Sequence, residues 1–175
     1  MRWEALFADM EAQLDAVRTA DLAAEVAELT RAERATVGLS DRLRAARGSP
    51  VTVRLHGGEH ISGLLVDVAH QWFLLDDRGR RALVPCAAVA AVRGLTRHSA
   101  AAAGAVERRL TLGHALRALA RDRSVVQVAT DGGELTGRVD RVGADHLDLA
   151  VGHEETRGGE PWAVPFAAIR VVRSC

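Results

Sequence analysis

The stretch that decides the fold is VPCAAVAAVR, residues 84–93, because it recurs as VPFAAIRVVR at residues 164–173. The motif GGE at residues 57–59 likewise recurs at residues 132–134. The offset between matching positions is 73 to 75 residues early in the copies and 80 near their ends, since the second copy carries an insertion around residues 152–160. Matches that keep this order along the chain indicate an internal duplication.

Each copy has the pattern of a short helix followed by five short strands. Val51, Val53 and Leu55 alternate with polar residues, as in a half-buried strand. Glycines inside the second strand of each copy, Gly63 and Gly137, indicate that two backbones approach closely there. The predicted helices are 41–47 and 114–122, and the predicted strands are 51–55, 60–68, 72–76, 81–85 and 88–93, then 125–130, 134–142, 146–151, 161–165 and 168–173.

Five short, bent strands after a helix favour a small barrel, because closing the sheet removes its edges. The predicted fold class is mainly β with helices: an N-terminal amphipathic helix followed by two tandem five-stranded small barrels, each preceded by a short helix. The predicted domains are the N-terminal amphipathic helix at 1–30, the first helix plus barrel at 31–95, an Ala/Arg-rich linker helix at 96–112, and the second helix plus barrel at 113–175.

The strand-two glycines, the five bent strands and the turn before the last strand resemble the Sm-like family of small barrels, the Hfq and LSm type, over about residues 40–94 and 113–174. The resemblance implies that both barrels are Sm-like. The tandem pattern is also similar to that of actinobacterial chains labelled as transcriptional regulators, but no stretch of this sequence resembles a helix-turn-helix strongly enough to support that label. Both RNA-contacting motifs of the family are missing from both copies. Where the first motif has aspartate and asparagine, this sequence has Ala69 and Phe73, then Gly143 and Leu147. The resemblance therefore implies the fold and not the family's RNA binding.

Residues 1–30 belong to neither copy and carry a net charge of −5. Their apolar residues recur at the spacing of one helix face. That candidate partner-binding face consists of Trp3, Phe7, Met10, Leu14, Val17, Leu22, Val26 and Leu29. Two interpretations stay open: an amphipathic helix packed across the barrels, or a helix for dimerisation or partner binding. A membrane-surface helix is disfavoured, because its acidic polar face would be repelled by anionic lipid.

The chain has 23 basic residues, all of them arginine, and 23 acidic residues, so its formal net charge is zero. Zero net charge removes the global electrostatic argument for nucleic-acid binding. Residues 96–123 nevertheless carry +4, and arginine binds phosphate in a bidentate manner. The candidate nucleic-acid contacts are Arg78, Arg80, Arg81, Arg97, Arg108, Arg109 and Arg117. The competing interpretation is a solvated face that pairs with the acidic N-terminal segment.

No group of residues has the spacing of a catalytic, cofactor or metal site. Cys86 lies in an apolar stretch and is predicted to be a small core residue. His56 and His60 flank a predicted turn without metalloprotease spacing. Trp72 and Trp162 are predicted to be half-buried. We therefore expect no enzyme activity, no cofactor, no metal and no membrane span. We expect the chain to be cytoplasmic and to bind a protein partner or to self-associate. The predicted function is a non-enzymatic interaction or scaffold protein; the alternative is a nucleic-acid (RNA) binding regulatory protein that uses its arginine clusters.

Overall fold

The structure of the chain is a computed structural model that describes residues 13, 18–31, 35–101, 104, 109–152 and 160–175. The chain divides into two compact units. Unit 1, Met1–Gly38, contains a helix over residues 18–31. Unit 2, Leu39–Cys175, contains the ten strands that the described residues form. No helix within the described ranges is long and apolar enough to cross a membrane.

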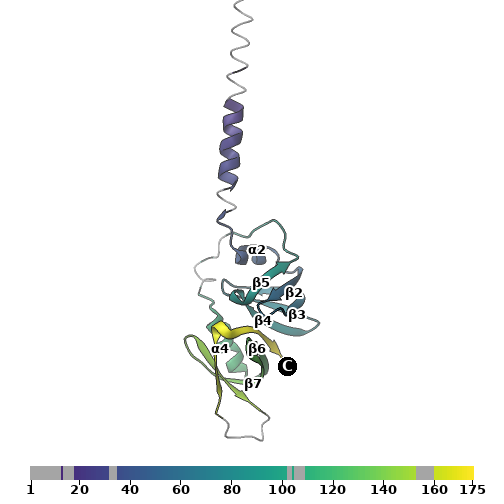
Figure 1. Cartoon of the computed structure of the whole chain (residues 1–175), viewed down its shortest axis with the longest axis vertical. Helices are drawn as coiled ribbons and strands as arrows, with labels where there is room; N and C mark the ends of the chain where they lie inside the picture. Colours follow the sequence, from purple (N-terminus) through teal and green to yellow (C-terminus); the bar gives the residue numbers. More distant parts are fainter. Residues whose placement is uncertain (1–12, 14–17, 32–34, 102–103, 105–108, 153–159) are drawn as a thin grey trace, which may run out of the picture. The chain divides into compact units, whose positions relative to one another are not determined.

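The elements of unit 2 follow one order twice (Figure 1). Helix α2, Leu39–Ala45, precedes the first five strands, and helix α4, Leu112–Asp122, precedes the last five. A short 3-10 turn, η1 at Cys86–Ala88 and η2 at Phe166–Ala168, leads into the last strand of each set. The strands are β1 Pro50–Leu55, β2 His60–Val68, β3 Trp72–Asp77, β4 Arg80–Pro85, β5 Val89–Arg93, β6 Val125–Thr130, β7 Gly133–Val142, β8 His146–Val151, β9 Trp162–Pro165 and β10 Ile169–Ser174. Each strand begins and ends within one residue of its predicted range.

The strands form a single ten-stranded sheet in the order β5-β1-β2-β3-β4-β10-β6-β7-β8-β9, and neighbouring strands are antiparallel. The predicted pair of closed barrels, and with it the tandem Sm-like fold, is therefore wrong. The physical reason lies at β4, whose free side is taken by β10 through the pairs Leu83–Val172 and Ala82–Arg173. A barrel closed within the first copy would need that same side of β4 for β5. The sheet stays open and ends at β5 and β9.

Of the predicted helix at 1–30, the described residues 13 and 18–30 are helical, and the described helix continues to residue 31; residues 1–12 and 14–17 lie outside the described residues. Of the predicted linker helix at 96–112, the described residues 96–101, 104 and 109–111 are not helical, and α4 begins at Leu112. Thr111 is the N-cap of α4, because its side chain accepts a hydrogen bond from the backbone N–H of His114.

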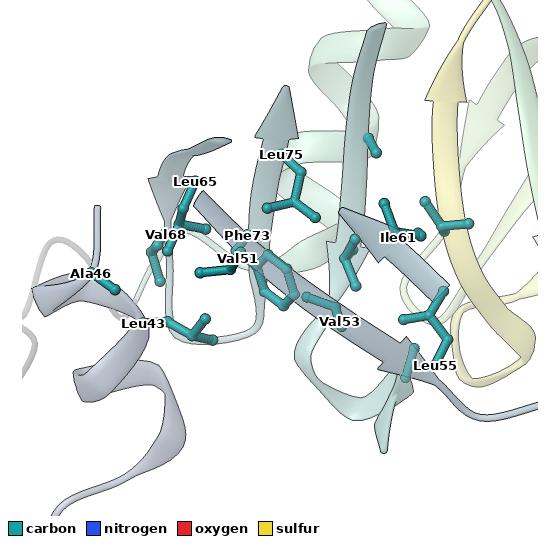
Figure 2. Packing of buried hydrophobic residues seen from close by; sticks show 14 of the residues in the cluster. Leu43, Ala46, Val51, Val53, Leu55, Ile61, Leu65, Val68, Phe73 and Leu75 are labelled. Carbon is teal, nitrogen blue, oxygen red and sulfur yellow. The ribbon is translucent and has the colours of Figure 1, made fainter. Parts of the chain in front are cut away.

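Two apolar clusters form the core of unit 2. The first contains Leu43 of α2, together with inward residues of β1, β2 and β3 such as Val53 and Phe73 (Figure 2). The second contains Leu116 of α4 and inward residues of β6 to β10. Each cluster also takes residues from the other set of strands: Ala129 and Val171 belong to the first, and Leu83 belongs to the second. The junction between β4 and β10 is therefore packed as well as hydrogen-bonded.

The glycines predicted to mark close backbone contact do so. A Cβ at Gly63 would lie 2.7 Å from the carbonyl oxygen of Asp76 on β3, and a Cβ at Gly137 would overlap the carbonyl oxygen of Ala150 on β8. Both overlaps are with backbone atoms, which cannot turn away as a side chain can. These two positions accept only glycine without moving a neighbouring strand.

We expect Gly137→Ala to destabilise unit 2 by about 1–3 kcal/mol, the usual cost of forcing extra volume into a packed interior. Urea unfolding followed by circular dichroism measures the change. Gly132→Ala is the matched control, because a Cβ there meets only the Thr130 Oγ1 atom, at 3.7 Å, and the backbone is not left-handed. Equal unfolding midpoints for the two variants would contradict the prediction.

Candidate functional site: an arginine groove

A groove of about 780 Å³ lies between α4 and β7. The helix side of the groove comes from one face of α4. Leu112 and Leu116 are buried in the second apolar cluster, whereas Arg117 and Arg121, four residues apart, are exposed and share a face. Packing of the apolar face of α4 thus fixes where its arginines lie.

The strand side of the groove depends on an irregularity in β7. Residues three apart in a regular strand point to opposite faces of the sheet. Between Val139 and Arg141 the pairing with β8 shifts by one residue, which is the signature of a β-bulge. The bulge allows Arg138 and Arg141 both to line the groove, while Val139 stays buried in the core. One extra residue in the strand therefore adds a second cation to this wall.

Among the described residues that line the groove, five arginines face one aspartate, an excess of four formal positive charges. The charged and titratable residues of the lining are His114, Arg117, Arg121, Arg123, Arg138, Asp140 and Arg141. All seven are exposed. This is a strongly cationic surface in a chain whose overall charge is zero.

Two of the five guanidinium groups are held by the protein itself. The Nη2 atom of Arg117 donates to the Gly143 carbonyl at 3.4 Å, and Nε of Arg138 lies 3.3 Å from Oδ1 of Asp140. Among the described residues, no ion pair or hydrogen bond is formed by the side chains of Arg121, Arg123 and Arg141. These three groups are free to bind an anion.

Arg123 has an unusual backbone. It is the C-cap of α4, with φ of +52° in the left-handed region, and its N–H donates to the Ala120 carbonyl. Glycine is the common residue at left-handed positions that end a helix, because a side chain there is strained. An arginine at this position places a guanidinium at the groove at some cost to the fold.

The other predicted nucleic-acid contacts within the described residues do not join this groove. Arg78, Arg80 and Arg81 lie at the hairpin between β3 and β4, where Arg81 Nε is 3.3 Å from Asp76 Oδ2. Arg97 and Arg109 lie in the linker, and Arg108 lies outside the described residues. Of the six predicted contacts that the structure describes, only Arg117 lines the groove. The groove residues that the prediction missed are Arg121, Arg123, Arg138 and Arg141.

The predicted partner-binding face is described only in its second part. Trp3, Phe7, Met10, Leu14 and Val17 lie outside the described residues. Leu22, Val26 and Leu29 lie on the helix of unit 1 and are 63%, 61% and 59% exposed. Their spacing of four and three residues places them on one stripe of the helix.

Several other titratable and aromatic side chains of the described residues lie outside the lining of the groove. In the described part of the chain, no group of three or more His, Cys, Asp or Glu side chains could hold a metal ion. The Arg170 guanidinium donates to Oδ1 of Asp131 at 2.6 Å and lowers the pKa of that carboxyl. The hydrogen bond between the His146 ring and Asp145 likewise lowers the pKa of the Asp145 carboxyl. Both carboxyl groups lie outside the lining of the groove. Trp72 is half-buried and donates to the Leu110 carbonyl, but Trp162, predicted to be half-buried, is 60% exposed.

No family model matches this chain, and no curated protein is significantly similar to it. The resemblance to Sm-like barrels is therefore without support from either the sequence comparisons or the sheet topology.

Cys86 and Cys175 are both free thiols in different surroundings. Cys86 is half-buried against the first apolar cluster, and this burial raises the pKa of its thiol from 9.0 to about 11. Only the thiolate is nucleophilic, so a rise of this size leaves about 100-fold less reactive form near neutral pH. Cys175 is exposed.

We therefore expect one fast and one slow thiol when the folded protein reacts with an aromatic disulfide reagent at pH 8. Cys175→Ser removes the fast phase, and Cys86→Ser leaves it unchanged. In urea both thiols react quickly, because unfolding removes the burial that raises the pKa of Cys86. A fast phase that survives Cys175→Ser in the folded protein would show that Cys86 is accessible as thiolate.

Proposed function

We propose that the chain is a non-enzymatic interaction or scaffold protein that assembles through the helix of unit 1. The observation that supports this proposal is the apolar stripe of Leu22, Val26 and Leu29, each about three-fifths exposed. Burying one such side chain contributes about 1.5–3 kcal/mol. A stripe of three that stays in water is therefore a favourable docking surface for another helix.

The rest of this helix is suited to remain in water. Asp21, Glu25 and Glu28 are exposed, and Glu28 forms an ion pair with Arg31 at 3.1 Å. Helices with one apolar stripe and charged flanks associate through the stripe, and the charges then restrict which partners fit. This pattern supports either self-association or binding to an apolar stripe on another protein.

The open edges of the sheet support the same proposal. Among the described strands, β5 and β9 each have a neighbour on one side only, which leaves backbone N–H and C=O groups available for pairing. Trp162 on β9 adds an exposed aromatic side chain, a type enriched at protein interfaces. The two free thiols fit a reducing compartment, which is the basis for proposing a cytoplasmic location.

A second function, a regulatory protein that binds nucleic acid, is favoured by one specific observation: the arginine groove between α4 and β7. Both functions can belong to one chain, because the stripe lies in unit 1 and the groove in unit 2.

To test assembly through the stripe, we would replace Leu22, Val26 and Leu29 together by glutamate. Charged groups cannot be buried against an apolar partner without a large cost, so we expect loss of self-association or of the co-purifying partner. Multi-angle light scattering over a range of concentrations, with affinity purification of the full chain, gives the readout.

The matched control is Ala20→Glu, Ala24→Glu and Ala27→Glu, which adds the same charge to exposed positions on the opposite face of the same helix. This control should assemble as the unmodified chain does. A chain that is monomeric at every concentration and keeps all partners after the triple substitution of the stripe would contradict the proposal.

A further inference from the structure

We infer that the arginine groove binds the phosphodiester backbone of a nucleic acid without reading its base sequence. This inference rests on the second function proposed above and assigns its site, its ligand chemistry and its mode of recognition. It replaces the scattered arginines selected from the sequence by one surface, formed by α4, the residue that caps it and β7.

The number and placement of the cations support a polymeric anion. One arginine can bind one phosphate through two parallel hydrogen bonds. Here five arginines line a groove of about 780 Å³ from two walls, which is more than a single phosphate group requires. Nucleic acids have a higher linear charge density than acidic peptides, with one charge per about 1.7 Å of duplex axis. They are therefore the best match for an excess of four positive charges.

Local stability does not explain all five arginines. Cations near the C-terminus of a helix interact favourably with its dipole, which accounts for Arg121 in the last turn of α4. The dipole of α4 gives no reason for Arg138 and Arg141, which belong to a strand. Arg123 opposes local stability, since it adopts a left-handed backbone that glycine would adopt without strain. Binding of an anion gives one reason for all of them.

The lining of the groove also indicates how the ligand is recognised. Its described residues include no Phe, Tyr or Trp on which a base could stack, and the imidazole of His114 is their one aromatic ring. Phosphate contacts determine position and affinity but carry no sequence information. The affinity should therefore depend little on base sequence. It should fall steeply as the salt concentration rises, because binding releases counterions from the phosphates and added salt opposes that release.

The test uses fluorescence anisotropy with the full chain and labelled oligonucleotides of about 20 nucleotides, as single-stranded RNA, single-stranded DNA and duplex DNA. The decisive variant is Arg123→Gly, which removes one groove cation and relaxes the backbone at the same time. We expect about tenfold weaker binding at about 50 mM salt, and a salt slope of log affinity reduced by about 0.7–0.9. Its melting temperature should be equal to or above that of the unmodified chain, so loss of binding cannot be attributed to unfolding.

The chain offers a matched control in Arg78→Gly. Arg78 is the other described non-glycine residue with a left-handed backbone, at φ of +55°, and it lies at the hairpin tip instead of the groove. Arg78→Gly removes the same charge and relieves the same strain, yet we expect affinity within about twofold of the unmodified chain, as for a cation that contacts no phosphate. Arg121→Gln with Arg141→Gln should weaken binding further than Arg123→Gly alone.

Three results would overturn the inference. Absence of binding to any oligonucleotide at about 50 mM salt would remove both the site and the second function. Equal weakening by Arg78→Gly and Arg123→Gly would leave nucleic-acid binding in place but move it away from the groove. Polyglutamate that displaces the oligonucleotide at an equal concentration of charged groups would show that the groove selects acidic protein segments instead.

Discussion

The pairing of β4 with β10 is the interaction on which the rest of unit 2 depends. This pairing joins two sets of five strands into one sheet, and side chains from both sets reinforce it. The backbone N–H of Arg81 donates to the Ser174 hydroxyl at 3.0 Å. Arg173 forms ion pairs with Glu59 and Glu134, which belong to different sets of strands. Leu83 and Val171 meanwhile pack into the apolar cluster of the opposite set. Separating the two sets would expose apolar area on both, so they form one compact unit.

The same pairing decides which surfaces remain available for function. Because β4 and β10 are used at the centre, β5 and β9 are left as the edges of the sheet. The groove lies away from this junction, between α4 and β7, so its arginines are not needed to hold the sheet together. The apolar stripe lies in unit 1, outside the sheet altogether. The charged side chains of the groove and the apolar stripe thus take no part in the two apolar clusters of the core.

Much of the local structure could be predicted because its causes are local. Alternating apolar residues, paired glycines and proline placed the ten strands to within one residue. Gly63 and Gly137 were correctly taken as points of close backbone contact. The site was predicted poorly, since only Arg117 of the five groove arginines was among the candidates. Arg121 lies on α4 and Arg123 is its C-cap, whereas Arg138 and Arg141 lie on the bulged strand β7. Nothing in the sequence spacing shows that this helix and this strand are neighbours.

The sequence by itself determined the short helix that precedes each set of strands, the ten strands, the turns between them, and that this order of elements occurs twice. Backbone preferences and apolar periodicity act over a few residues, so these features could be predicted. Only the tertiary structure decided whether the strands close into two barrels or continue as one sheet. That choice depends on which strand takes the free side of β4, and β5 and β10 both carry the short apolar pattern of a suitable partner. Only the packing of α4 beside β7 brought the arginines together, because contacts between segments far apart in the chain leave no periodic signal in either one.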